Sequence, residues 1–219
     1  LQAFAPGKNN GMPQAAYFYT KAMPVAADVL NRVYTVLDQS GANVLVSMPL
    51  QIADSAKVSA LYRDLGRYTP VMGISFDDTA VAGEAKIQDE LLGAFQENRP
   101  NAVVMQRISA GELDGNTARQ DFVKRFNEAS GAGNYVIVTA DPLRDGGKDA
   151  EIYLKKVAEL IRKTGQVRKA IVEVNVYDTK HEQWMDEKDF NASMDTLKKE
   201  GIRNMGYTPD TYCQWKGRV

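Results

Sequence analysis

The sequence predicts an α/β fold of the (β/α)8, TIM-like barrel type. Short apolar, β-branched runs alternate with amphipathic stretches along the whole chain of 219 residues. Each intervening stretch is long enough to hold a crossover helix, which parallel neighbouring strands require. No glycine-rich phosphate fingerprint follows any of the runs, and this disfavours a doubly wound dinucleotide-binding fold. A barrel of parallel strands covered by helices is therefore the expected architecture.

Composition narrows the class of protein. Hydrophobic residues make up 44% of the chain, charged residues 25%, and the formal net charge is -1. A generic nucleic-acid binder would show a basic excess, so no nucleic-acid partner is expected. The single cysteine, Cys213, and the single histidine, His181, make a zinc cluster or a Ser-His-Asp triad improbable. No apolar run reaches the ~20 residues that a membrane span needs.

Seven segments carry apolar residues on both faces, as strands buried under helices do. They are Leu1–Phe4, Asn43–Leu50, Val71–Phe76, Ala102–Ile108, Tyr135–Ala140, Ala170–Tyr177 and Arg203–Tyr207. Because the series begins at Leu1, an eighth strand and its helix would fit immediately upstream. We therefore expect a barrel that lacks its first βα unit, with residues 1–219 forming one domain.

Six segments place apolar residues three and four positions apart, which is the spacing of an amphipathic helix. They are Ala26–Gln39, Ser55–Arg67, Ala85–Gln96, Asn116–Ala129, Asp149–Thr164 and Lys188–Glu200. Val36 falls on the apolar face predicted for the first of these helices. Ile152 falls on the apolar face predicted for the fifth. Both side chains are therefore expected to be buried.

The active site of a (β/α)8 barrel is built at the carboxyl ends of its strands. In this chain those positions hold carboxylates, an amide and aromatic rings. They are Phe4, Asp77, Asp78, Asp141, Glu173, Asn175, Tyr177, Tyr207 and Asp210. Acids can act on a glycosidic oxygen and aromatic rings can stack on sugar rings, so this set suits a sugar polymer.

Simpler interpretations stay open for the same residues. Asp77 or Asp78 could cap the helix that follows the strand. Glu173 lies among apolar residues, and its charge needs either a structural Arg or Lys or a bound substrate. Tyr207 and Tyr212 could merely close the mouth of the barrel. Trp184 and Trp215 could be sugar platforms, although their places in the fold are not defined by the sequence.

Several segments, in order along the chain, point to one family. They are Leu1-Gln2-Ala3-Phe4, Ala16-Tyr17-Phe18, Met23-Pro24, Ala27-Asp28-Val29-Leu30-Asn31-Arg32-Val33, Val46-Ser47-Met48-Pro49, Leu61-Tyr62-Arg63-Asp64-Leu65, Gly73-Ile74-Ser75-Phe76-Asp77-Asp78 and Gly206-Tyr207-Thr208-Pro209-Asp210. With these segments the chain resembles the C-terminal glycoside hydrolase domain of the bacterial poly-β-1,6-N-acetyl-D-glucosamine N-deacetylases. The match spans nearly the whole chain.

The resemblance implies an endo-glycoside hydrolase that cleaves partially de-N-acetylated poly-β-1,6-N-acetylglucosamine during the export of biofilm polysaccharide. It implies an N-terminal, metal-dependent deacetylase domain in the parent protein, a periplasmic location, and no cofactor for this domain. An anchor to the outer membrane through the N-terminal region and an export partner in that membrane would be consistent with it. Asp78 is expected to be the general acid, with Asp77 tuning it or positioning water. Asp141 and Glu173 are expected to bind amino groups of the polymer.

Two departures from the family pattern support an alternative function. In the family one residue separates the aromatic residue from an Asp-Asp pair, whereas here Phe76 is followed directly by Asp77 and Asp78. An ungapped match then puts Thr79 at the second Asp position. Ser47 stands where the family usually has Trp. The alternative is a polysaccharide-binding module of the same fold that does not cleave its ligand.

Overall fold

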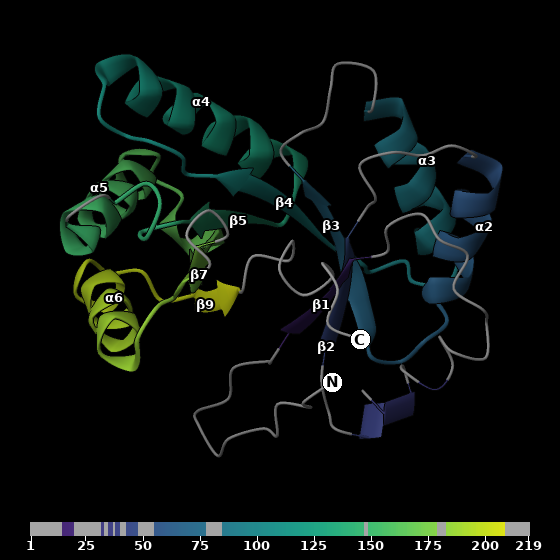
Figure 1. Cartoon of the computed structure of the whole chain (residues 1–219). Coiled ribbons are helices and arrows are strands. Elements are labelled where there is room, and N and C mark those ends of the chain that lie inside the picture. The colour runs from purple at the N-terminus through teal and green to yellow at the C-terminus, as the bar shows by residue number, and fades with distance from the viewer. Residues whose placement is uncertain are drawn as a thin grey trace. The chain divides into compact units, whose positions relative to one another are not determined.

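The computed structural model of the chain describes residues 15–19, 32, 35–36, 38–39, 43–47, 55–77, 85–146, 149–178 and 183–208 (Figure 1). The chain forms two compact units, residues 1–105 and residues 106–219. Among the described helices, none combines the length and the apolar character that crossing a membrane would need.

The described part of the first unit contains parallel strands and the helices α2 and α3. Its elements are β1 (Ala15–Tyr19), β2 (Asn43–Ser47), α2 (Ser55–Leu65), β3 (Val71–Asp77) and α3 (Ala85–Gln96). β1 pairs with β2 and β2 pairs with β3, both in parallel. Residues 32, 35–36 and 38–39 are helical as well. The strand order therefore follows the chain order.

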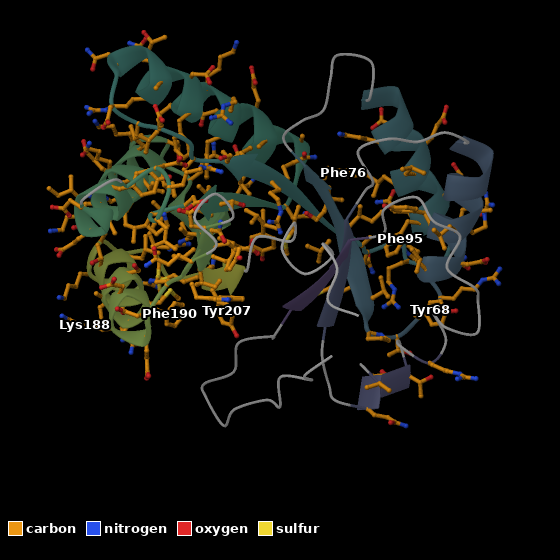
Figure 2. All side chains as sticks on the ribbon, viewed as in Figure 1. Tyr68, Phe76, Phe95, Lys188, Phe190 and Tyr207 are labelled. Atoms are coloured by element: carbon orange, nitrogen blue, oxygen red, sulfur yellow. The ribbon has the colours of Figure 1, made fainter. Side chains whose placement is uncertain are left out.

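The core of the first unit lies between β3 and its two helices. Ile74 and Phe76 of β3 pack in one cluster with Tyr62 and Leu65 of α2 and with Phe95 of α3 (Figure 2). All five side chains are almost completely buried. Since Ile74 and Phe76 are two residues apart on a strand, the side of β3 that carries them is the helix-covered side.

The second unit repeats the same alternation. β4 (Val103–Ser109) begins in the first unit and ends in the second. The elements that follow are α4 (Asn116–Ala132), β5 (Tyr135–Ala140), α5 (Ala150–Lys163), a 3-10 turn (Val167–Lys169), β6 (Ala170–Asn175), β7 (Tyr177–Asp178), β8 (Gln183–Trp184), α6 (Glu187–Lys199) and β9 (Met205–Thr208). β5, β6 and β9 pair in parallel and in that order, whereas β7 and β8 form a short antiparallel hairpin.

Helices α4, α5 and α6 cover one face of these strands, and α5 contacts both of the others (Figure 1). The core between them is apolar. It includes Ile108, Phe122, Phe126, Val136, Val138, Leu154, Val157, Ile161, Val172, Val174 and Leu197. Alternate residues of β5 and β6 supply this core, so the residues between them lie on the opposite face of the sheet.

Helix ends follow the residues that favour them. Asp149 caps α5 by accepting a hydrogen bond of 2.9 Å from the Ile152 backbone, and Asp186 caps α6 in the same way at 2.7 Å from the Asp189 backbone. Gly201 follows α6 with φ of 84°, the left-handed conformation that glycine adopts without steric cost. These signals explain why the predicted bounds of the last two helices lie within a residue of the observed ones.

The strand–helix alternation and the parallel strands in chain order confirm the predicted TIM-like α/β fold class. The prediction of one domain over residues 1–219 stays a prediction. Some details of the expected structure were wrong. Ala15–Tyr19 forms a strand that was not expected, while the predicted strand Leu1–Phe4 lies outside the described residues.

Two side chains expected in the core face water instead. Ile152 is 50% exposed and Val36 is 55% exposed. In α5 the buried side includes Tyr153 and Leu154, and the helix is rotated so that these side chains are buried in place of Ile152. The predicted strand Ala170–Tyr177 ends at Asn175, and Tyr177 belongs to the antiparallel hairpin.

Candidate functional site

Polar side chains gather on the face of β5 and β6 that the helices do not cover. Val138 and Ala140 of β5, like Val172 and Val174 of β6, belong to the helix-side core. Thr139, Asp141, Glu173 and Asn175 therefore lie on the other face, toward the carboxyl ends of their strands. Asp141, Glu173 and Asn175 are buried. Buried polar groups need partners, and the partners of these three identify the chemistry of the site.

Glu173 is paired with an arginine from the neighbouring part of the sheet. Nη1 of Arg107, on β4, lies 3.1 Å from Oε2 of Glu173, and the two side chains are 11% and 2% exposed. The same Nη1 lies 3.5 Å from the hydroxyl oxygen of Thr139, which stands opposite Glu173 on β5. Of the two partners that the sequence left open for Glu173, the structure supplies the basic side chain.

Gly206 stands opposite Glu173 on the other neighbouring strand, β9. A Cβ placed on Gly206 would lie 3.6 Å from Cγ of Glu173, which is an ordinary contact distance. The side chain of Glu173 therefore extends beside the backbone of β9 where that strand has no side chain of its own.

Asp141 accepts two hydrogen bonds and forms an ion pair. Nδ2 of Asn175 donates a hydrogen bond of 2.9 Å to Oδ2, and the backbone N–H of Arg144 donates one of 3.0 Å to Oδ1. The guanidinium of Arg144 lies 3.6 Å from Oδ2. Burial nevertheless raises the pKa of Asp141 above its usual range, because the loss of water outweighs these hydrogen bonds.

Arg144 also binds Asp145, the next acidic residue in the loop after β5. Its Nε and Nη2 atoms donate to the two carboxylate oxygens of Asp145, at 2.8 and 2.9 Å. This two-point contact with Asp145 holds the pKa of Arg144 above its ordinary value. Arg144 thus places one positive charge between two carboxylates, while half of its own side chain stays exposed.

One exposed aromatic ring lies in β9, and another lies in the hairpin that follows β6. Tyr207 of β9 is 45% exposed and meets Phe190 of α6 edge to face, with ring centroids 5.6 Å apart (Figure 2). Partial burial raises the pKa of Tyr207. Trp184 of the hairpin is 57% exposed and meets Tyr177 in a similar way.

The remaining candidates have these positions. Asp77 is the last residue of β3. Asp78, Phe4 and Asp210 lie outside the described residues. Within the described part of the chain, no group of three or more His, Cys, Asp or Glu side chains is arranged to hold a metal ion.

The structure adds Arg107, Thr139 and Arg144 to the residues that the sequence singled out. Arg107 carries the same signal as Glu173, a charged residue inside an apolar strand, and could have been found by it. Arg144 could not have been found from the sequence, because a charged residue in a polar loop is ordinary. Asn175 and Asp141 were both expected at the site, but the hydrogen bond between them depends on the register of β5 and β6.

The fold and this polar strand-end arrangement are those of a glycoside-hydrolase-like α/β protein. The family model described as "Hypothetical glycosyl hydrolase family 13" matches residues 85–208, more than half of the chain, and the chain belongs to this family. None of the curated proteins compared matches it.

Solved structures support the same fold at low sequence identity. The glycoside hydrolase domain of PgaB (BpsB) from Bordetella bronchiseptica aligns with a TM-score of 0.71 and 16% identity, over 92% of this chain and 85% of that domain. A glucosidase from Croceicoccus marinus aligns with a TM-score of 0.52 and 14% identity, over 83% of this chain and 46% of the other. Active domain 2 of chitinase from Pyrococcus furiosus also aligns at 0.52, with 12% identity, over 80% and 64%.

Proposed function

We propose that this chain is an endo-glycoside hydrolase that cleaves partially de-N-acetylated poly-β-1,6-N-acetylglucosamine. The observation that carries the proposal is the layer of buried polar side chains at the carboxyl ends of β5 and β6, in a chain of a glycosyl hydrolase family. A barrel enzyme acts at this end of its strands. The similarity to the PgaB glycoside hydrolase domain supports the choice of polymer.

In this proposal Asp77 and Asp78 supply the general acid and the carboxylate that assists it. Asp78 is the proposed general acid, and Asp77, the last residue of β3, tunes it or positions water. A glycosidase acid must keep its proton near neutral pH, which burial and a nearby carboxylate both favour.

The other residues have supporting roles. Tyr207, with Phe190 fixing its orientation, offers an exposed ring on which a sugar can stack. Phe4 and Asp210 are proposed substrate contacts as well. Asp141, Glu173 and Asn175 form the polar floor of the site. The oxygen lone pairs that Arg107 and Arg144 do not occupy accept hydrogen bonds from the amino groups of the polymer. The domain acts in the periplasm, follows a deacetylase domain in the parent protein, and serves an outer-membrane export partner.

The test is a cleavage assay on oligomers of β-1,6-linked glucosamine with defined acetylation, with mass spectrometry of the products. Asp77→Asn and Asp78→Asn are compared with Glu128→Gln, which changes an exposed acid on α4 that forms an ion pair with Lys124 of the same helix. Loss of the acid's proton lowers the rate by roughly 10²–10⁴ and leaves affinity nearly unchanged. Full activity of both Asn variants would show that neither residue is the acid.

The alternative function is a binding module, and Thr79 at the second family Asp position favours it. The unmodified chain then binds the same oligomers without shortening them. A Thr79→Asp variant distinguishes the two functions: the appearance of cleavage products would show a hydrolase fold that lost its second carboxylate. Binding without cleavage by both forms would support the binding module.

A further inference from the structure

A short antiparallel hairpin follows β6 and presents a tryptophan to water. Tyr177 of β7 stands opposite Trp184 of β8, and Asp178 stands opposite Gln183. The rings of Tyr177 and Trp184 meet edge to face, with centroids 4.8 Å apart and planes at 65°. More than half of Trp184 is nevertheless exposed. A large apolar side chain that is fixed in orientation but open to water is typical of a binding surface.

One hydrogen bond extends the hairpin, and one side chain anchors it to the core of its unit. The backbone N–H of Met185 donates a hydrogen bond of 2.8 Å to the carbonyl of Val176, which extends the pairing beyond Trp184. The Met185 side chain packs against the core of the second unit. A pair of two-residue strands would not be stable alone, so these contacts explain why the hairpin keeps its shape.

The hairpin is also connected to the polar layer. The backbone N–H of Tyr177 donates a hydrogen bond of 3.2 Å to Oδ1 of Asn175, and the amide group of Asn175 donates to Asp141. Trp184 is therefore positioned, through Tyr177, by the same residues that form the floor of the candidate site. The exposed ring lies beyond the carboxyl end of β6, where a barrel enzyme binds its substrate.

We propose that Trp184 is a stacking platform for a pyranose ring of the polysaccharide, and that Tyr177 is the positioning residue that holds the indole in place. This inference rests on the proposed function for the class of ligand. The C–H groups of a sugar pack against an aromatic face, and a ring held by an edge-to-face neighbour loses little conformational entropy on binding. Trp184 thereby sets affinity for the polymer without taking part in bond cleavage.

The experiment measures binding and cleavage of partially de-N-acetylated β-1,6-glucosamine oligomers by the full chain. Trp184→Ala should weaken binding about tenfold, and Trp184→Phe should retain most of the affinity. In a cleavage assay the loss should appear in KM, with kcat unchanged, because stacking contributes equally to ground state and transition state. The melting temperature should not change, since the ring is mostly in water.

Tyr135→Ala is the matched control. Tyr135 is also an exposed aromatic ring of the second unit, but it begins β5 and so lies at the amino ends of the parallel strands. Its removal should leave affinity unchanged. Tyr177→Ala should weaken binding and alter the near-ultraviolet circular dichroism of Trp184, whereas Tyr177→Phe, which keeps the ring, should restore both.

The outcomes separate this inference from the proposed function. If the unmodified chain binds or cleaves the oligomers and Trp184→Ala does so equally well, Trp184 is not a stacking platform and the proposed function stands. An equal loss of affinity in Tyr135→Ala would mean that the loss does not depend on the position of Trp184, and the proposal of a stacking platform would again be wrong. If the unmodified chain neither binds nor cleaves any of the oligomers, both proposals are overturned.

Discussion

The amide of Asn175 donates a hydrogen bond of 2.9 Å to the carboxylate of Asp141, and this bond joins the ends of two adjacent parallel strands. Each residue has a further partner in the backbone: Asp141 accepts from the N–H of Arg144, and Asn175 accepts from the N–H of Tyr177. The loop after β5 and the hairpin after β6 are therefore oriented by one buried pair. Disturbing that pair should affect both segments.

The first prediction concerns the pH dependence of stability. The pKa of Asp141 is raised in the folded chain, so the folded state binds the proton more readily than the unfolded state. The unfolding free energy then increases as the pH falls from above the raised pKa toward the ordinary value of about 3.9 for an aspartate in the unfolded chain. The Asp141→Asn variant has no carboxyl group at this position, so it does not show this contribution to the pH dependence of the unfolding free energy.

The measurement compares urea unfolding of the unmodified chain and Asp141→Asn at several pH values. Subtracting one curve from the other cancels the groups that titrate in both. The unmodified chain should gain stability relative to Asp141→Asn as the solution is acidified. A difference that moves in the opposite direction would mean that hydrogen bonding, rather than burial, dominates the pKa of Asp141.

The second prediction concerns the buried ion pair. Arg107→Met removes the guanidinium that lies 3.1 Å from Glu173 and should lower the unfolding free energy by about 3–5 kcal/mol, because a buried carboxylate loses its partner. The double variant Arg107→Met, Glu173→Leu should be more stable than Arg107→Met alone. Denaturant unfolding of the two single variants and the double variant gives the coupling energy. A coupling energy near zero would show that the pair is not an energetic unit.

A third prediction follows from Ser75 on β3. Its side chain is completely buried, and its hydroxyl has no hydrogen-bond partner among the described residues. Ser75→Ala removes a hydroxyl whose burial is not compensated, so the unfolding free energy should stay the same or rise by up to about 1 kcal/mol. Ser130→Ala is the control, because the buried Ser130 hydroxyl donates a hydrogen bond of 2.9 Å to the Asn127 carbonyl. Thermal unfolding should rank Ser75→Ala as the more stable of the two.

The fourth prediction concerns a close approach of two strands. A Cβ on Gly73 of β3 would collide with the backbone carbonyl of Val103 on β4. Gly73→Ala should therefore destabilise the chain by roughly 1–3 kcal/mol, as overpacking does. Gly93→Ala, in α3, meets open space and should stabilise the chain by up to about 1 kcal/mol, since alanine is the better helix former. Equal melting temperatures for the two variants would contradict this account.

The sequence by itself determined the fold class, most of the elements and the positions where chemistry can occur. The helix predicted over Ala85–Gln96 has those bounds in the structure, because its apolar spacing is regular. Glu173 could be recognised as exceptional because a charge inside an apolar strand must have a partner. The strand Ala15–Tyr19 was missed because five residues carry too little periodicity to separate a strand from a loop.

Only the tertiary structure decided which residues meet. Arg107 and Glu173 are far apart in the chain, and the strand pairing of β4, β5 and β6 brings them within 3.1 Å. Ile152 has the spacing of a core residue, yet Tyr153 and Leu154 occupy the buried side of α5 and leave Ile152 half exposed. Local patterns follow from the geometry of one element, whereas partners depend on strand register and on which helix face the whole core accepts.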